Sequence, residues 1–282
     1  MTGEPAPRRT LAGRVLLVSG GSRGIGLAVA RRAARDGARV TLVAKTAEPH
    51  PRLEGTVFTA AAEVEAAGGE ALAVVGDIRD EAVVEAAVRQ TVERFGALDI
   101  CVNNASAINL DGVEALEMKR YDLMQDINTR GTYVVSRACI PHLRRSSNPH
   151  ILTMSPPLSL DPRWYAPHLA YTIAKFGMSM CTLGLAEELR DAGIAANSLW
   201  PRTMIATAAV RNLLGGEAAI ARSRSPEIMA DAAHVILTRP SREATGNFYI
   251  DDEVLAAEGV TDLSGYGPAD PAGLVTDLFL EG

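Results

Sequence analysis

Tyr171 and Lys175 stand four positions apart in a stretch expected to be helical, and together they could carry acid–base chemistry. Residues at this spacing share one face of a helix, so the phenol and the ammonium would be neighbours. A tyrosine with its ordinary pKa of about 10 is a poor base at neutral pH, and a nearby cation favours the phenolate. We therefore expect Tyr171 to exchange a proton with a substrate oxygen. A tyrosine on an apolar helix face could instead serve only for packing.

A glycine-rich turn follows the first apolar run of the chain, residues 14–19. A strand, a glycine turn and a helix in this order bind dinucleotide phosphates, because the helix N-terminus presents unpaired N–H groups. The glycines permit a tight turn, a close backbone approach and close packing of the helix on the strand. A turn without any ligand is the alternative. The candidate nucleotide-binding residues here are Gly20, Ser22, Arg23, Gly24, Ile25 and Gly26.

The charges after the second apolar run indicate which nucleotide would bind. A site for NAD(H) usually has a carboxylate at the end of the second strand, where it holds the adenosine ribose. Here the run 39–44 ends at Lys45, and no acid follows before Glu48. Arg23 adds a second cation, and two cations suit the 2′-phosphate of NADP(H). NADP(H) is therefore favoured and NAD(H) stays open, while both cations could also be solvated surface charges.

Strand-length apolar runs alternate with helix-period segments along nearly the whole chain. This alternation predicts one α/β domain of the doubly wound Rossmann type over residues 1–282, with a parallel sheet of about seven strands flanked by helices. Its core would cover about 11–250, and 251–282 would form a C-terminal tail. The expected strands are 14–19, 39–44, 71–76, 99–102, 150–154, 194–199 and 248–250. The expected helices are about 24–36, 59–67, 80–95, 117–143, 168–190 and a segment opening at 225–226.

The glycine spacing G-x-x-x-G-x-G, the Y-x-x-x-K pair and the order of these motifs resemble the short-chain dehydrogenase/reductase superfamily over about 11–250. The resemblance implies hydride transfer between a nicotinamide nucleotide and a carbonyl or alcohol, with Lys175 free to hold the nicotinamide ribose. It also implies that Asp77 contacts the adenine, that Asn104 lies at the cofactor and that Asn128 holds a water linked to the lysine. The two asparagines could instead bond to local backbone.

The family spacing does not identify the substrate-polarising serine in this sequence. In the superfamily this serine lies just past the fifth strand, thirteen residues before the tyrosine, and the residue at that spacing here is Leu158. Ser155 stands at the strand end and resembles the first serine of the family's pair, whereas Pro156 replaces the second. We predict Ser155 for this role and hold Ser159 as the second choice.

The segment Trp200–Thr203 follows the sixth strand, where the superfamily has a Pro-Gly segment that meets the nicotinamide. By this resemblance Thr203 could contact the carboxamide, although an ordinary turn is the alternative. The stretch that follows, to about Arg222, is rich in Ala and Leu. The superfamily closes over its substrate here, so the composition suggests an apolar ligand.

Longer segments are similar to the hydroxysteroid dehydrogenase-like protein 2 family. This family is linked to lipid metabolism, and related bacterial enzymes are often labelled citronellol/citronellal dehydrogenases. The resemblance implies a lipid- or terpenoid-like carbonyl or alcohol as substrate, and a homodimer or homotetramer built through the helices around 117–143 and 168–190. Some members carry a C-terminal sterol-carrier domain, which we do not expect within these 282 residues. The similar segments are 44–51, 128–133, 155–158 and 171–178.

Composition argues against several other classes of protein. The net charge is −6 without a long basic run, so we expect no nucleic-acid partner, and the strand-sized apolar runs predict no membrane span. The five histidines and three cysteines lack metal-ligand spacing, so we expect no metal. The cysteines are typical of reduced core residues in a cytoplasmic protein. An enoyl-CoA-type reductase and an NADPH-binding regulatory protein without catalysis stay open as alternatives.

Overall fold

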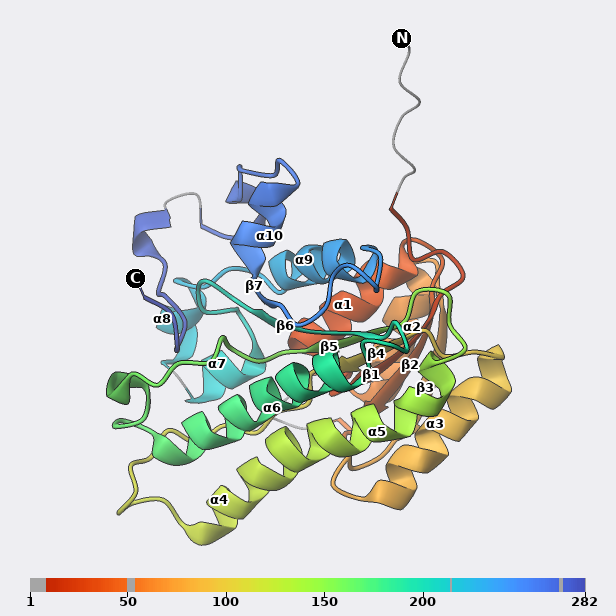
Figure 1. Cartoon of the computed structure of the whole chain (residues 1–282). Helices are drawn as coiled ribbons and strands as arrows, with labels where there is room; N and C mark the ends of the chain where they lie inside the picture. The colour runs from red at the N-terminus through yellow and green to blue at the C-terminus, as the bar shows by residue number, and fades with distance from the viewer. Residues whose placement is uncertain (1–8, 50–53, 214, 269–270, 282) are drawn as a thin grey trace.

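The computed structural model describes residues 9–49, 54–213, 215–268 and 271–281. Its centre is a seven-stranded parallel sheet in the order β3-β2-β1-β4-β5-β6-β7, shown in Figure 1. This topology confirms the predicted doubly wound α/β fold. The strands are β1 (Val15–Ser19), β2 (Arg39–Ala44), β3 (Glu70–Val75), β4 (Ile100–Asn103), β5 (His150–Thr153), β6 (Ala195–Trp200) and β7 (Phe248–Ile250).

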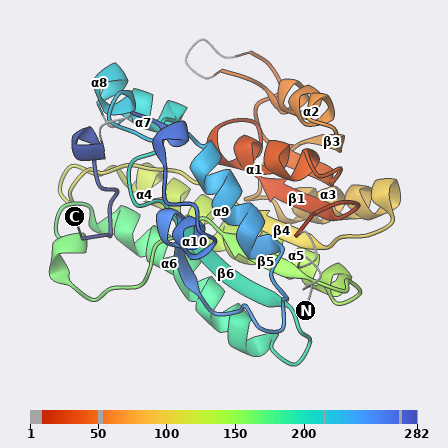
Figure 2. The same ribbon diagram turned by 90° about the horizontal axis from the view of Figure 1, so that it is seen from above.

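Helices cover both faces of the sheet (Figures 1 and 2). Four of them, α1, α2, α9 and α10, pack on one face, and α3, α5 and α6 pack on the other. Because both faces are covered, every residue of β1, β4, β5 and β6 is buried, and these strands are nearly continuous apolar runs. The helices are α1 (Gly24–Ala34), α2 (Val57–Ala66), α3 (Glu81–Phe95), α5 (Gly131–Leu143), α6 (Leu169–Glu188), α9 (Glu227–Leu237) and α10 (Asp251–Ala257).

The ends of α3 follow directly from the sequence. The Asp80 carboxylate accepts hydrogen bonds from the N–H groups of Ala82 and Val83, which satisfies the first turn. Gly96 ends the helix in a left-handed conformation with φ of 80°, which costs glycine nothing.

The predicted helix 117–143 is interrupted. It consists of α4 (Met118–Met124), a π-helical turn η1 (Gln125–Arg130) and then α5. A π-helical turn inserts one extra residue per turn and is common at functional sites. Here the turn contains Asn128, so the interruption sets the direction of one predicted site residue.

The segment after residue 250 differs from the predicted tail. It begins with α10, whose buried Val254 and Leu255 pack with the core that α9 and α1 form. Two short 3-10 turns follow, η3 (Ser264–Tyr266) and η4 (Pro271–Gly273). The described end of the chain then returns to the side of the molecule where α6 begins (Figures 1 and 2).

The carboxyl ends of all seven strands lie at one edge of the sheet, as parallel pairing requires. The chain order reverses between β1 and its neighbour β4, and ligands of doubly wound sheets bind at such a switch point. The glycine turn follows β1, Lys45 follows β2 and Asn104 follows β4, so the predicted nucleotide residues converge there. The sheet topology therefore positions the site.

Helix α6 is apolar enough to resemble a membrane span. Its mean hydropathy over an 18-residue window is 1.2, but 61% of that window is buried inside the protein. The helix packs against β6 and the π-helical turn and carries Tyr171 and Lys175 on its buried side. Its position in the core accounts for its composition.

Candidate active site

The glycine turn packs tightly against the loop after β4. Gly20 and Gly24 have φ of +68° and +56°, a conformation that other residues rarely adopt. A Cβ atom on Gly20 would lie 2.8 Å from Cα of Ala105, and one on Gly26 would lie 2.5 Å from Nδ2 of Asn104. Asn104 Nδ2 donates hydrogen bonds to the carbonyl oxygens of Ser19 (3.2 Å) and Gly20 (2.9 Å). Asn104 therefore fixes the shape of the turn.

The N-terminus of α1 is open for a phosphate. Arg23 precedes the helix in an extended conformation without a side-chain cap, and the first turn contains no acid. Its guanidinium instead donates to the carbonyl oxygens of Glu54 and Gly55 at 3.0 and 2.9 Å. Ser22 is buried within the turn, and Ile25 packs against the core. Uncapped N–H groups beside a cation suit an anionic ligand, so this turn fits a dinucleotide phosphate.

A charged cluster lies beyond the ends of β2 and β3. Lys45 Nζ is 3.0 Å from Asp77 Oδ2, and Arg79 Nη2 is 2.7 Å from the same oxygen. Hydrogen bonds from Arg79, and then from Lys45, hold the pKa of Asp77 well below its usual range despite partial burial. Two cations share one carboxylate, so the cluster keeps an excess positive charge. Residues 50 and 51 of the family-like segment 44–51 lie outside the described residues.

Tyr171 and Lys175 are buried together at the start of α6, with 5% and 3% of their surfaces exposed. Lys175 Nζ donates to the carbonyl oxygen of Met154 at 3.0 Å and lies 5.0 Å from the centre of the Trp200 ring. Burial lowers the pKa of Lys175 to about 7, and the negative charge of Asp277 opposes that shift. The ammonium is therefore held by a carbonyl and an aromatic ring.

The pKa of Tyr171 is raised rather than lowered. Burial is the larger cause, and the negative charge of Asp277 is the second. Burial also raises the pKa of Asp277 to about 7, although part of this residue's surface is exposed. Asp277 thus acts electrostatically on both members of the predicted pair. Sequence reasoning missed it, because a single acid in an apparent tail has no spacing that links it to Tyr171.

Asn128 is fully buried in the π-helical turn. Its Oδ1 accepts the N–H of Ala107 at 2.7 Å, and its Nδ2 donates to the Ala107 carbonyl at 2.9 Å. The side chain therefore anchors the loop after β4 by two bonds to backbone. Its role in holding a water stays a prediction.

Ser155 is fully buried, and its hydroxyl shares a 2.8 Å hydrogen bond with that of Ser198 on β6. Ser198 in turn donates to Thr182, which is eleven residues beyond Tyr171, or about 16 Å along the helix axis. Ser159 is engaged in its own loop, where its hydroxyl accepts the N–H of Asp161. Neither serine hydroxyl is bonded to Tyr171 here, and the substrate-polarising role of Ser155 stays a prediction.

Thr203 is buried, and its Oγ1 has no hydrogen-bond partner among the described residues. Its neighbour Arg202 is not a free surface charge: its N–H donates to Asp251 and its guanidinium pairs with Asp252 and Glu253 on α10. An unpaired buried hydroxyl costs stability unless a ligand satisfies it. Thr203 is therefore available to a polar group of a bound cofactor, and its predicted contact with the carboxamide stays a prediction.

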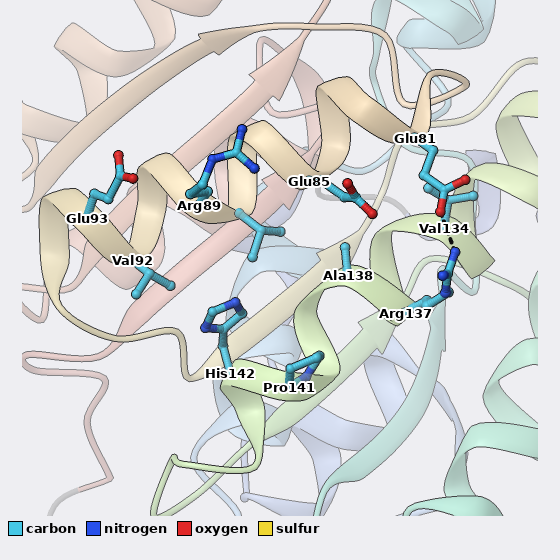
Figure 3. Close-up of a pocket in the computed structure, with 11 residues that line it drawn as sticks. Glu81, Glu85, Arg89, Val92, Glu93, Val134, Arg137, Ala138, Pro141 and His142 are labelled. Atoms are coloured by element: carbon cyan, nitrogen blue, oxygen red, sulfur yellow. Dashed lines mark hydrogen bonds and ion pairs between the residues drawn. The ribbon is translucent and has the colours of Figure 1, made fainter.

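A groove of about 560 Å³ lies between α3 and α5 on one covered face of the sheet (Figure 3). Its rim carries Glu85, Arg89 and His142, and an ion pair joins Glu81 to Arg137. None of the residues predicted from the sequence to bind or react lines this groove. Within the described part of the chain, no group of three or more His, Cys, Asp or Glu is arranged to hold a metal ion.

Comparison with known proteins shows the family to which the chain belongs. A family model described as short chain dehydrogenase matches residues 14–218. The chain therefore belongs to the short-chain dehydrogenase family and is a dehydrogenase/reductase of that class. It is also 55% identical over 272 residues to hydroxysteroid dehydrogenase-like protein 2 of Danio rerio, covering 96% of this chain. The chain spans 65% of that relative's length, and the resemblance seen in the sequence is confirmed.

Solved structures share the fold. A short chain dehydrogenase from Mycobacterium thermoresistibile is 59% identical with a TM-score of 0.91, covering 96% of each chain. A Xanthomonas campestris protein assigned as a dehydrogenase is 56% identical with a TM-score of 0.93, covering 97% of this chain and all of that one. A more distant metagenomic oxidoreductase, 26% identical with a TM-score of 0.69 over 85% of this chain and 96% of that one, was solved with NADP.

Because the glycine turn is tightly packed, adding one methyl group at Gly26 should destabilise it. Gly26→Ala would push Asn104 off the carbonyl oxygen of Gly20, so we expect a loss of about 1–3 kcal/mol in unfolding free energy and weaker nucleotide binding. Gly112→Ala is the matched control, because a Cβ atom there meets nothing within 4 Å. Denaturant titration and nucleotide titration of both variants check this, and equal behaviour of the two would contradict it.

Proposed function

We propose that this protein is an NADP(H)-dependent oxidoreductase that interconverts an alcohol with an aldehyde or ketone, with Tyr171 as the general acid/base. The observation that carries the proposal is the burial of Tyr171 and Lys175, side by side, at the edge of the sheet where the glycine turn lies. A reactive proton donor shielded from water beside a nucleotide-binding turn suits hydride chemistry.

Each residue of the proposed site has its own role. The nicotinamide, when bound, supplies or accepts the hydride. The Tyr171 hydroxyl gives its proton to the substrate oxygen during reduction and takes it back during oxidation. Lys175 is anchored on the Met154 carbonyl and the Met178 sulfur, and its remaining N–H donor would hold a ribose hydroxyl while the charge stabilises a developing phenolate. Thr203 would satisfy its free hydroxyl on the carboxamide.

The protonation state favours the reductive direction. Because burial and Asp277 raise the pKa of Tyr171, the phenol keeps its proton at neutral pH, which is the protonation state that reduction requires. Oxidation needs the phenolate, which the same two causes disfavour. We therefore propose carbonyl reduction as the more readily catalysed direction near pH 7.

The preference for NADP(H) is supported by charge. Lys45 and Arg79 lie at the ends of β2 and β3, and Arg23 lies in the glycine turn. Between the end of β2 and Glu48 the chain has no acid to receive ribose hydroxyls, whereas the cations suit a 2′-phosphate. The complex of the metagenomic oxidoreductase with NADP is consistent with this proposal.

The proposal extends to substrate and assembly. Apolar and aromatic side chains from several elements surround Tyr171, which favours an apolar substrate. Exposed apolar side chains on α5 and α6 favour a homo-oligomer through these helices. These side chains are Tyr133, Ile173, Met180 and Leu183.

Replacing Tyr171 by phenylalanine removes the proton that the mechanism requires. We expect Tyr171→Phe to lower kcat for carbonyl reduction by about 10²–10⁴-fold, with the Kd for NADPH unchanged within a few fold. Tyr133→Phe is the control, because Tyr133 is exposed on α5. NADPH absorbance with a panel of aldehydes, ketones and an enoyl thioester measures this. NADPH binding without turnover in the wild type would instead favour a nucleotide-binding regulatory protein.

Replacing Lys45 tests the choice of nucleotide. If Lys45 contacts the 2′-phosphate, Lys45→Ala removes one charge-assisted hydrogen bond and weakens NADPH binding by about tenfold or more. Binding of NADH should change little. Lys119→Ala is the control, because Lys119 is an exposed lysine paired with Glu117. Fluorescence titration with both nucleotides measures the effect, and an equal loss for NADPH and NADH would contradict the assignment.

A further inference from the structure

The described end of the chain, residues 275–281, lies along the loop that follows β6; we call it the C-terminal strap. The N–H of Met204 donates to the carbonyl of Val275 at 2.9 Å, and the N–H of Asp277 donates to the carbonyl of Arg202 at 3.0 Å. Trp200 Nε1 donates to the carbonyl of Leu278 at 2.8 Å. These bonds attach the strap to the loop where the substrate and the nicotinamide are expected.

The strap inserts Phe279 into a cluster of aromatic rings. Only 4% of Phe279 is exposed, and its ring centre lies between 5.2 and 6.1 Å from the centres of five other rings. Its plane is within 28° of the Tyr171 plane, so the two rings are stacked. The five rings belong to Trp164, His168, Tyr171, Phe176 and Trp200.

The backbone of Phe279 is strained. Its φ is 72°, and among the described residues it is the one non-glycine residue with a positive φ. A side chain with a Cβ atom disfavours this conformation, and such strain persists only where surrounding contacts enforce it. The ring contacts of Phe279 supply that enforcement, so removing the ring from its site also releases backbone strain.

Phe279 lies against Tyr171, the residue that must react. A substrate oxygen has to come within about 2.6–3.2 Å of the Tyr171 hydroxyl to receive its proton. The Tyr171 ring stacks against Phe279, and only 5% of the Tyr171 surface is exposed, so little room remains beside its hydroxyl. A substrate therefore gains access when it displaces Phe279 from the aromatic cluster.

We propose that Phe279 is a specificity-determining residue that occupies the place of a ring-bearing substrate. The displaced phenyl ring leaves a space bounded by Trp164, Phe176 and Trp200, and a ligand must fill it to replace the lost contacts. The substrate class is therefore a carbonyl compound or alcohol with an aliphatic or aryl ring next to the reacting carbon. Small open-chain substrates have too little apolar surface to displace Phe279. The inference rests on the proposed function in taking Tyr171 as the acid.

Intrinsic fluorescence reports this displacement directly. The chain has two tryptophans, Trp164 and Trp200, and both contact Phe279. Titrating the wild type with cyclohexanol, without nucleotide, should change the emission saturably at concentrations where 2-propanol has no effect. Phe279→Ala should bind cyclohexanol at least fivefold more tightly, because nothing has to be displaced. An emission that ignores cyclohexanol, or weaker binding by Phe279→Ala, would overturn the proposal.

Two further variants keep the test decisive. Phe58→Ala removes an exposed phenylalanine on α2 and should match the wild type. Phe279→Gly removes the ring and also relieves the positive φ, so it reproduces the tighter binding if Phe279→Ala fails to fold.

Turnover separates this inference from the proposed function. In the wild type, kcat/KM for cyclohexanone should exceed that for acetone by more than tenfold, and the ratio should shrink in Phe279→Ala. An unchanged ratio in the presence of turnover overturns the role of Phe279 and leaves the oxidoreductase intact. Saturable cyclohexanol binding with no turnover of any carbonyl supports the pocket and overturns the proposed chemistry.

Discussion

Lys175 brings an amine into a place from which water is excluded, and its charged form has to be held by nearby polar groups. The Met154 carbonyl at the end of β5 accepts its hydrogen bond, the Trp200 ring at the end of β6 lies beside it, and Asp277 acts on it electrostatically. One ammonium is therefore surrounded by the ends of two strands, the start of α6 and the C-terminal strap. Tyr171 is carried into the same place, because it lies one helical turn away.

The nucleotide side of the site is built by a different means. In the glycine turn there is no room for larger side chains. Asn104 donates hydrogen bonds to carbonyl oxygens of this turn and so fixes its shape. Asn128 also holds the loop after β4, through two hydrogen bonds to the backbone of Ala107. The parallel sheet brings the glycine turn and the aromatic cluster around Tyr171 to the same edge. The C-terminal strap covers the aromatic cluster, whereas the N-terminus of α1 beside the glycine turn is left open.

Much of this was predictable from sequence. The seven strands and the main helices follow from apolar periodicity, and the glycine turn, Lys45, Tyr171 and Lys175 follow from local spacing. Side-chain direction in loops was not predictable: Ser155 stands at the expected strand end, but its hydroxyl is directed to Ser198. Phe279 and Asp277 were missed because their contacts are with residues about 75 to 115 positions earlier, and no local pattern encodes such contacts.

The central claim is that burial and the negative charge of Asp277 set the acid–base chemistry of Tyr171. The pH dependence of kcat/KM for alcohol oxidation tests it most directly, in the wild type and in Asp277→Asn. Oxidation requires the Tyr171 phenolate, and the negative charge of Asp277 raises the pKa of Tyr171. Removing that charge should lower this pKa, so the account predicts that the rising limb of the profile moves to lower pH in Asp277→Asn. A limb that stays in place, or moves to higher pH, would contradict the account.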